Sequence, residues 1–227
     1  FSFDIQETLE RCLWPGATSR RAMHSTRLSQ RSNGTKMRRS AVEDCLVVLE
    51  HFGVDPRHAK AIDVGGAEQV NLDGAFTANP IRRVCEDLTL LDGGFSVEKI
   101  QTAANTVGDF LEEDTISPLQ SRFDLVFTFD TLEHVKNPFL FCEHLVAVTR
   151  PGGYVFAATV FSWSYHPAPE DYFRFSPAGL RELFENQCNR YSSDFEVLHS
   201  GWGSDKKGVL LLGRRRAFTE GGYDHYR

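Results

Sequence analysis

The chain has 227 residues, of which 41% are hydrophobic and 25% charged, a composition that suits one packed domain and argues against general disorder. No stretch approaches the ~18 uncharged apolar residues that a membrane span requires, and the five cysteines are scattered and odd in number, which suggests neither a disulfide framework nor a metal site. We therefore expect a soluble, cytoplasmic protein with no membrane partner.

The first 39 residues show no sustained hydrophobic period and carry a concentrated positive charge. Residues 11–39 contain eight Arg or Lys residues and no acid, so this stretch carries +8 and the remainder of the chain −14. A basic segment can gather phosphate or carboxylate groups, but one with Ser, Thr and Gly among its arginines can equally be a solvated arm. We expect a basic N-terminal arm at residues 1–39 and one domain at residues 40–227.

Helix signals begin at the start of the domain. Ser40 and Glu43 form a capping-box pattern, apolar residues follow at helical spacing, and Gly53 suits the C-terminal stop. Two further helix starts are marked by a capping residue followed by proline, at Asn137-Pro138 and at Ser176-Pro177.

Six short apolar runs predict β-strands, at residues 61–64, 81–88, 124–129, 154–160, 195–200 and 208–213. Because helical segments separate several of these runs, we expect right-handed crossovers and a doubly wound, mostly parallel sheet. Only a short polar stretch separates the last two runs, which predicts an antiparallel hairpin at one edge. Ligands of such α/β sheets bind beyond the C-terminal ends of the strands, so the turns there are candidate sites.

The turn after the first strand is rich in small residues. The segment IDVGGAEQ places Asp63 at the strand end, followed by Gly65, Gly66 and Ala67, where the backbone can pass close to a ligand. It resembles the first motif of class I S-adenosylmethionine-dependent methyltransferases, in which an acidic residue and a glycine-rich turn hold the methionine part of the cofactor. The family spaces three glycines at alternate positions, whereas Ala67 and Gln69 replace the second and third here. An ordinary strand-to-loop turn is the alternative interpretation.

Acidic residues near the next two turns are further candidates for cofactor binding. Glu86 and Asp87 follow Asp63 by 23 and 24 residues, close to the ~20 expected for a carboxylate that binds the ribose hydroxyls. We favour Asp87, and the alternative is that both acids are solvated. Asp109 and Phe110 resemble the family's segment after the third strand, where an acid receives the adenine amino group and an apolar neighbour packs on the ring.

Residues 123–159, FDLVFTFDTLEHVKNPFLFCEHLVAVTRPGGYVFAAT, carry the most specific resemblance. They look like the fourth strand, turn, helix and fifth strand of the small-molecule, type 11-like branch of this superfamily, including its LEHV signature and Arg-Pro-Gly-Gly stop. The strand ends at Phe129, and Asp130 emerges at its C-terminal end facing the expected cofactor site. Glu133 and His134 follow in the signature, where the alternative is that they only hold the turn by hydrogen bonds. Residues 151–153 should turn the chain into the next strand.

A loop at residues 161–180 concentrates aromatic and polar side chains at the same end of the sheet. It resembles the HPxPxDYxRFxPxGL loop of many bacterial methyltransferases of this branch. We expect Tyr165, His166, Asp171 and Arg174 to bind the acceptor, and the alternative is an aromatic cover packed over the sheet.

These resemblances imply a seven-stranded, Rossmann-like methyltransferase fold and a transferase that moves a methyl group from S-adenosyl-L-methionine to a small-molecule acceptor. Methyl transfer needs mainly alignment of the acceptor, and an oxygen acceptor also needs a general base. His166 and His134 are our candidates for that base, while Asp130 could orient the acceptor or line the cofactor pocket. The basic arm would act as a lid over an anionic acceptor, such as a sugar, polysaccharide precursor or secondary metabolite.

Two other functions stay open. Because Ala67 and Gln69 depart from the family's glycine pattern, the chain could be a catalytically inactive, methyltransferase-like binding or scaffold protein. A nucleic-acid methyltransferase is disfavoured, because the body of the chain is acidic and no Asn-Pro-Pro-Tyr motif occurs at residues 128–135. The sequence leaves open whether the protein is a homo-oligomer and whether oxygen, nitrogen or carbon is methylated.

Overall fold

The computed structural model describes residues 39–66, 69–70, 76–77, 79–93, 106–167, 170–185 and 194–217. Residues 1–38 and Ala67 lie outside these ranges, so the basic arm and its boundary stay predictions. None of the helices in the described ranges has both the length and the apolar character needed to cross a membrane.

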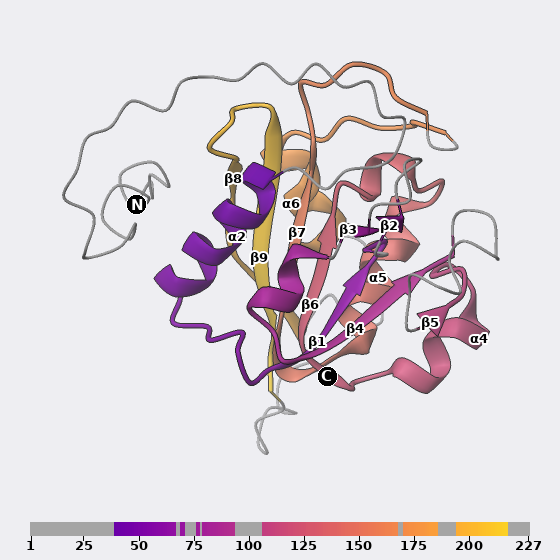
Figure 1. Ribbon diagram of the computed structural model, residues 1–227, viewed down its shortest axis with the longest axis vertical. Helices are drawn as coiled ribbons and strands as arrows, with labels where there is room; N and C mark the ends of the chain where they lie inside the picture. Colours follow the sequence, from indigo (N-terminus) through magenta and orange to yellow (C-terminus); the bar gives the residue numbers. More distant parts are fainter. Residues whose placement is uncertain are drawn as a thin grey trace, which may run out of the picture.

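A seven-stranded sheet in the order β5-β4-β1-β6-β7-β9-β8 forms the centre of the molecule (Figure 1). Its strands are β1 (Lys60–Val64), β4 (Asp87–Asp92), β5 (Thr106–Val107), β6 (Phe123–Phe129), β7 (Thr149–Val160), β8 (Phe195–Trp202) and β9 (Gly208–Arg215). The first five pair in parallel, whereas β9 pairs antiparallel with both β7 and β8. The predicted doubly wound sheet with an antiparallel edge hairpin is therefore confirmed. A separate small sheet joins β2 (Gln69–Val70) to β3 (Phe76–Thr77).

Helices cover both faces of the large sheet. Successive side chains of a buried parallel strand point to opposite faces, so both faces are apolar and both must be covered. The helices are α2 (Arg39–His51), α4 (Glu113–Ile116), α5 (Pro138–Val148) and α6 (Pro177–Glu185), with 3-10 turns η1 (Pro80–Arg83), η2 (Ser117–Leu119) and η3 (Leu132–His134). On one face Leu125 and Phe127 pack with α2. On the other face Ile62 and Val126 pack with α5 and α6. The core therefore has two layers of apolar side chains, one on each side of the sheet.

The predicted starts of α5 and α6 are confirmed by their capping hydrogen bonds. The side chain of Asn137 accepts a bond from the Leu140 N–H at 3.2 Å. The hydroxyl of Ser176 accepts one from the Gly179 N–H at 3.1 Å. In both helices the proline that follows the cap fills the first helical position, where no backbone donor is needed.

The predicted stop of α2 is confirmed, but its predicted capping box is wrong. Gly53 has φ of 68° and donates to Glu50, which is the left-handed cap that glycine favours. At the other end the helix already includes Arg39, so Ser40 lies inside its first turn. The Ser40 hydroxyl instead donates to Asp205 at 2.9 Å and ties the helix to the loop between β8 and β9.

Two strand boundaries also differ from the prediction. Residues 81–86 of the predicted strand do not form one, because Asn79 accepts a bond from the Ile81 N–H and Pro80 opens η1, so that β4 begins only at Asp87. This is the same Asn-Pro start signal that opens α5. Residues 151–153 do not precede β7 but lie within it, at a register irregularity against β6.

Candidate functional site

The turns after β1, β4 and β6 meet at one edge of the sheet, because these parallel strands end almost level. The register pairs Val64 with Leu91 and Asp63 with Phe127. The Gly65 N–H donates to the Leu91 carbonyl at 2.8 Å, and the Thr131 hydroxyl lies 3.5 Å from the Val64 carbonyl oxygen. The turns that follow β1 and β6 are therefore in direct contact.

Asp63 is fully buried beneath the first turn. Asn79 donates one side-chain N–H to Asp63 Oδ2 at 2.6 Å and another to the Gly66 carbonyl at 2.8 Å. Within the described part of the chain, Asp63 Oδ1 has no hydrogen-bond donor. Burial raises the pKa of Asp63 to about 7, against the lowering effect of the Asn79 hydrogen bond, and the charge of Asp92 adds to the rise. This carboxyl therefore changes charge close to neutral pH.

The two glycines of the first turn are required by close contacts. Gly65 has φ of 83°, and a Cβ added there would lie 2.3 Å from Thr131 Oγ1. A Cβ added at Gly66 would lie 2.1 Å from Asp63 Oδ2. Any larger side chain would push apart the turns that the site joins.

The structure corrects the placement of the predicted ribose-binding acids. Asp87 is the first residue of β4 and pairs with Lys60 at the start of β1, so it lies at the amino end of the strand, away from the turns. Glu86 precedes it and its exposed carboxylate lies 3.4 Å from His58. The acid at the carboxyl end of β4 is Asp92, next to the Val64 end of β1. The error follows from the misplaced strand at residues 81–88.

Asp109 and Phe110 follow β5, but the Phe110 ring lies in the hydrophobic core. It is buried and makes edge contacts with Phe141 and His144, at ring-centroid distances of 5.1 and 6.0 Å. The ring packs against α5, so little of its surface is free to pack on adenine as predicted. Asp109 is exposed and accepts a bond from the Leu111 N–H.

Asp130 occupies a sharp turn at the end of β6, directly after the buried Phe129. Its φ of 47° is left-handed, which is uncommon for a residue with a Cβ. Its N–H donates to the Ala158 carbonyl at 2.9 Å, and its side chain is buried. Such backbone strain is characteristic of residues held in place at functional sites.

Three residues from two different loops meet beside this turn, and we call Glu133, His134 and His166 the imidazole cluster. The Nε2 atoms of His134 and His166 lie 3.9 and 3.8 Å from Glu133 Oε1. The two imidazole rings touch edge to face, with centroids 4.9 Å apart. The Thr159 hydroxyl donates to Glu133 Oε2 at 2.7 Å, which anchors the carboxylate to the end of β7.

Backbone carbonyls define the tautomer of both histidines. His134 Nδ1 lies 2.6 Å from the Glu170 carbonyl oxygen, and His166 Nδ1 lies 2.9 Å from that of Ser164. A carbonyl can only accept, so each Nδ1 carries a proton and each neutral ring presents a lone pair at Nε2. Burial lowers the pKa of His134, although its bond to Glu170 opposes this. Both rings therefore offer basic nitrogens toward Glu133.

The loop that carries His166 is held by a partly buried ion pair. Arg174 donates to both carboxylate oxygens of Asp171, one of them at 2.6 Å, and Asp171 also accepts a bond from the His166 N–H at 2.8 Å. The Arg174 hydrogen bond lowers the pKa of Asp171 to about 2. The structure thus brings three of the four predicted acceptor-binding residues together, with Asp171 and Arg174 fixing the loop and Tyr165 exposed beside it.

The aromatic side chains of this loop are only partly packed. Five of them are exposed by a third or more, namely Phe161, Trp163, Tyr165, Tyr172 and Phe173, whereas Phe175 packs against the core. Aromatic side chains that stay exposed at a ligand end are available to contact a bound molecule.

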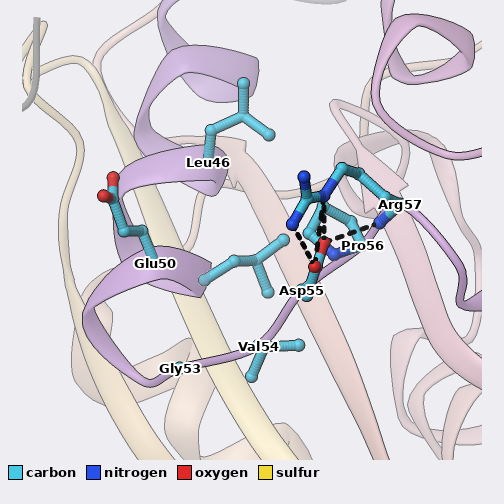
Figure 2. A pocket seen from close by; sticks show the side chains of 8 residues that line it. Leu46, Glu50, Gly53, Val54, Asp55, Pro56 and Arg57 are labelled. Atoms are coloured by element: carbon cyan, nitrogen blue, oxygen red, sulfur yellow. Dashed lines mark hydrogen bonds and ion pairs between the residues drawn. The ribbon is translucent and has the colours of Figure 1, made fainter.

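A hollow near α2 lies elsewhere on the molecule (Figure 2). Its walls come from the end of α2 and from the segment before β1, so it lies at the amino end of that strand, opposite to the candidate site. Arg57 lies at this hollow, and its guanidinium donates to Asp55 at 2.6 Å. We assign it no part in the site described above.

Three residues at the site are not predicted from the sequence, namely Asn79, Asp92 and Thr159. Asn79 could have been found, since an Asn-Pro pair at a short apolar run is a helix-start signal. Asp92 ends the apolar run LTLLD, which the misplaced strand concealed. Nothing in the sequence marks Thr159, because its contact with Glu133 depends on the register of β6 and β7.

Comparison with known proteins agrees with this architecture. The model of a family described as "Methyltransferase domain" matches residues 37–196. Among curated proteins, a ubiquinone biosynthesis O-methyltransferase of Chelativorans sp. is 29% identical over 132 residues, which cover 50% of this chain and 47% of the relative. A mitochondrial protein of that name from Arabidopsis thaliana is 25% identical over 121 residues, covering 50% of this chain and 38% of the relative. The chain thus spans about half or less of the length of these curated relatives.

Two solved structures share the fold at low sequence identity. A SAM-dependent methyltransferase from Aquifex aeolicus has a TM-score of 0.51 and 16% identity, covering 94% of this chain and all of that one. A Burkholderia thailandensis 1,6-didemethyltoxoflavin-N1-methyltransferase, solved with bound 1,6-didemethyltoxoflavin and S-adenosylhomocysteine, has a TM-score of 0.52 and 18% identity, covering 79% of each chain.

Proposed function

Because this chain belongs to the methyltransferase-domain family, within the class I S-adenosylmethionine-dependent superfamily, we propose that it transfers a methyl group from S-adenosyl-L-methionine to a hydroxyl of a small-molecule acceptor. The choice of oxygen is supported by the curated relatives, which are named O-methyltransferases.

The convergence of the turns after β1, β4 and β6 is the observation that carries this proposal. It places a glycine turn, a buried carboxylate and a second acid at the carboxyl edge of a parallel sheet, where such folds bind nucleotide-like ligands. The two glycines let the first turn pack closely against Thr131 and Asp63, and Asp63 Oδ1 has no donor among the described residues. A polar cofactor with cationic groups fits these features.

Asp92 is the acid that we now assign to the ribose hydroxyls. It ends the strand next to β1, so a carboxylate there can accept bonds from two hydroxyls of a nucleoside bound over the glycine turn. Asp63, Gly65, Gly66, Phe129 and Asp130 line the same edge and remain our candidates for cofactor contact.

The acceptor would lie between the cofactor and the imidazole cluster, which follows β6 and β7 at the same edge. Transfer is an in-line displacement in which the acceptor oxygen attacks the methyl carbon, the carbon–sulfur bond breaks and the hydroxyl proton leaves. His166 or His134 can take this proton at its Nε2 lone pair. Asp171 and Arg174 hold the His166 loop, and Tyr165 offers an exposed ring for acceptor binding.

The basic arm supports an anionic acceptor as the finer proposal. Residues 11–39 carry +8, and in this superfamily an N-terminal extension can close over the acceptor. Replacing several of its arginines by glutamine should weaken acceptor binding while leaving cofactor binding unchanged. An acceptor affinity equal to that of the wild type would contradict the proposal that the acceptor is anionic.

Calorimetry with S-adenosyl-L-methionine tests the cofactor site with a matched pair of variants. Asp92→Asn should weaken binding by roughly 10- to 100-fold, because a hydrogen bond to a charged group contributes about 1.5–3 kcal/mol. Asp87→Asn, at the other end of the same strand, should leave the affinity unchanged. No binding heat in the wild type at high cofactor concentration would instead support the methyltransferase-like scaffold.

A mass spectrum of small molecules that copurify with the protein tests the reaction itself. Methylation of an acceptor by the wild type, lost in His166→Gln, is the expected result. A protein that binds cofactor but methylates no copurified or offered hydroxyl compound would contradict the activity and keep only the binding function.

A further inference from the structure

We propose that the imidazole cluster is a binding site for one divalent transition-metal ion, held by Glu133 Oε1 and by Nε2 of His134 and His166. The sequence pattern does not predict such a site, since His166 follows His134 by 32 residues on a different loop. The proposal arises from their juxtaposition in the folded chain.

The distances within the cluster fit one ion. Two ligand atoms bound at 2.0–2.1 Å from a metal can lie no farther apart than about 4.2 Å. Glu133 Oε1 lies 3.9 Å from His134 Nε2 and 3.8 Å from His166 Nε2. All three ligand atoms lie within 4.8 Å of one another, so small side-chain shifts would close the site on an ion.

The Nδ1 atoms of the two histidines make the hydrogen bonds that are typical of metal-binding imidazoles. Metal-binding imidazoles almost always donate their second N–H to a carbonyl or carboxylate, which directs the free lone pair at the metal. His134 donates in this way to the Glu170 carbonyl, and His166 to that of Ser164, with Asp171 Oδ2 at 3.1 Å from the same nitrogen. Both rings are therefore oriented before any ion binds.

Burial supplies an independent indication of a ligand. The His134 side chain is only 9% exposed, and its Nε2 has no hydrogen-bond partner within the part of the chain that the structure describes. A buried polar atom without a partner costs about 1–3 kcal/mol, so it calls for an explanation such as an unseen water or ion. The His166 side chain is 30% exposed, which leaves a route of entry from solvent.

The ligand set indicates the class of metal. Two imidazoles and one carboxylate suit zinc, iron(II), cobalt or manganese rather than calcium, which prefers oxygen ligands throughout. Three protein ligands leave open positions for water or for an oxygen of another molecule. The ion would therefore be accessible to an acceptor and not enclosed by protein.

The consequence for catalysis rests on the proposed function. The ion would lower the pKa of an acceptor hydroxyl bound to it, so that the hydroxyl proton would pass to water and the oxygen would attack the methyl carbon while the carbon–sulfur bond breaks. With the ion bound, the Nε2 lone pairs of the two histidines would serve as ligands, so general-base catalysis by a histidine would belong to the metal-free protein. Acceptors with a second oxygen beside the hydroxyl would bind best, because both oxygens can reach the ion.

Metal binding can be tested on the full chain without any methyl transfer. Protein freed of metals with a chelator is titrated with Zn²⁺ by calorimetry and with Co²⁺ by visible absorption. One ion per chain is expected. Glu133→Gln and His166→Gln should each weaken Zn²⁺ binding at least roughly tenfold, since even the loss of an outer partner costs 10- to 100-fold.

His58→Gln is the matched control, because His58 also lies near a carboxylate, 3.4 Å from Glu86, but both side chains are exposed. It should leave Zn²⁺ affinity unchanged. If Glu133→Gln fails to fold, His166→Gln decides, since its side chain lies on a partly exposed loop. No bound ion in the wild type, or equal affinity in His166→Gln, would overturn the site. Cofactor calorimetry on the same metal-free protein reports separately on the proposed function.

Discussion

Binding of S-adenosyl-L-methionine should release a proton from Asp63, and the affinity should therefore rise with pH. Burial raises the pKa of this carboxyl to about 7 in the free protein. The cofactor carries a sulfonium and an ammonium group, and a cation at the turn above Asp63 favours the ionised carboxylate. If the pKa falls to about 4 on binding, about half a proton is released at pH 7 and nearly one at pH 5.5. By linkage, the affinity should rise almost tenfold per pH unit between about pH 4.5 and 6.5 and level off above about pH 7.5.

Calorimetry at each pH in two buffers of different ionisation enthalpy measures this release directly. Asp63→Asn keeps an oxygen to which Asn79 can donate but has no proton to lose. The heat of cofactor binding to this variant should therefore show no buffer dependence that comes from residue 63. Asp55→Asn, at an exposed carboxylate paired with Arg57, is the control and should release as much as the wild type. Wild-type affinity that stays constant from pH 5.5 to 7, without buffer dependence, would refute the placement of the cofactor over Asp63.

Two further predictions concern close contacts in the site. Gly66→Ala should cost about 1–3 kcal/mol of unfolding free energy and weaken cofactor binding, because the new Cβ meets Asp63 Oδ2. Gly179→Ala in α6 meets nothing closer than 3.5 Å and should be neutral or stabilising by up to about 1 kcal/mol in urea denaturation; equal losses at both positions would contradict the steric argument. Thr159→Val removes the hydroxyl that donates to the carboxylate of the imidazole cluster and should cost about 1.5–3 kcal/mol, against about 0.5–1.5 kcal/mol for Thr128→Val, whose hydroxyl donates to a neutral carbonyl. If Thr159→Val loses less unfolding free energy than Thr128→Val in the same urea experiment, the Thr159 hydroxyl does not donate to a charged carboxylate.

Most of the architecture could be predicted from the sequence because the signals involved are local. The apolar runs of β6 and β9 are long enough to identify buried strands without knowledge of their partners. An adjacent capping residue and proline predict the starts of α5 and α6, and one glycine predicts the end of α2. Each of these signals acts over a few residues, so the tertiary structure had little to change.

The start of β4 could not be settled in this way. Residues 81–88 and 88–92 are both apolar enough for a strand, and only the pairing of Lys60 with Asp87 and of Val64 with Leu91 fixes which run enters the sheet. Pairing register decides which end of a strand each side chain reaches. The candidate ribose-binding acid therefore moves from Asp87 to Asp92.

Local patterns alone predict a parallel α/β domain in which Asp63, the two glycines and the turn after Phe129 stand at the carboxyl ends of strands, because strand ends and glycine turns follow from neighbouring residues. The position of Phe110 in the core and the meeting of Glu133, His134 and His166 depend on the complete fold. Those contacts join residues from separate loops and strands. Their geometry depends on strand register and on how the loop after β7 folds back, which no local pattern contains.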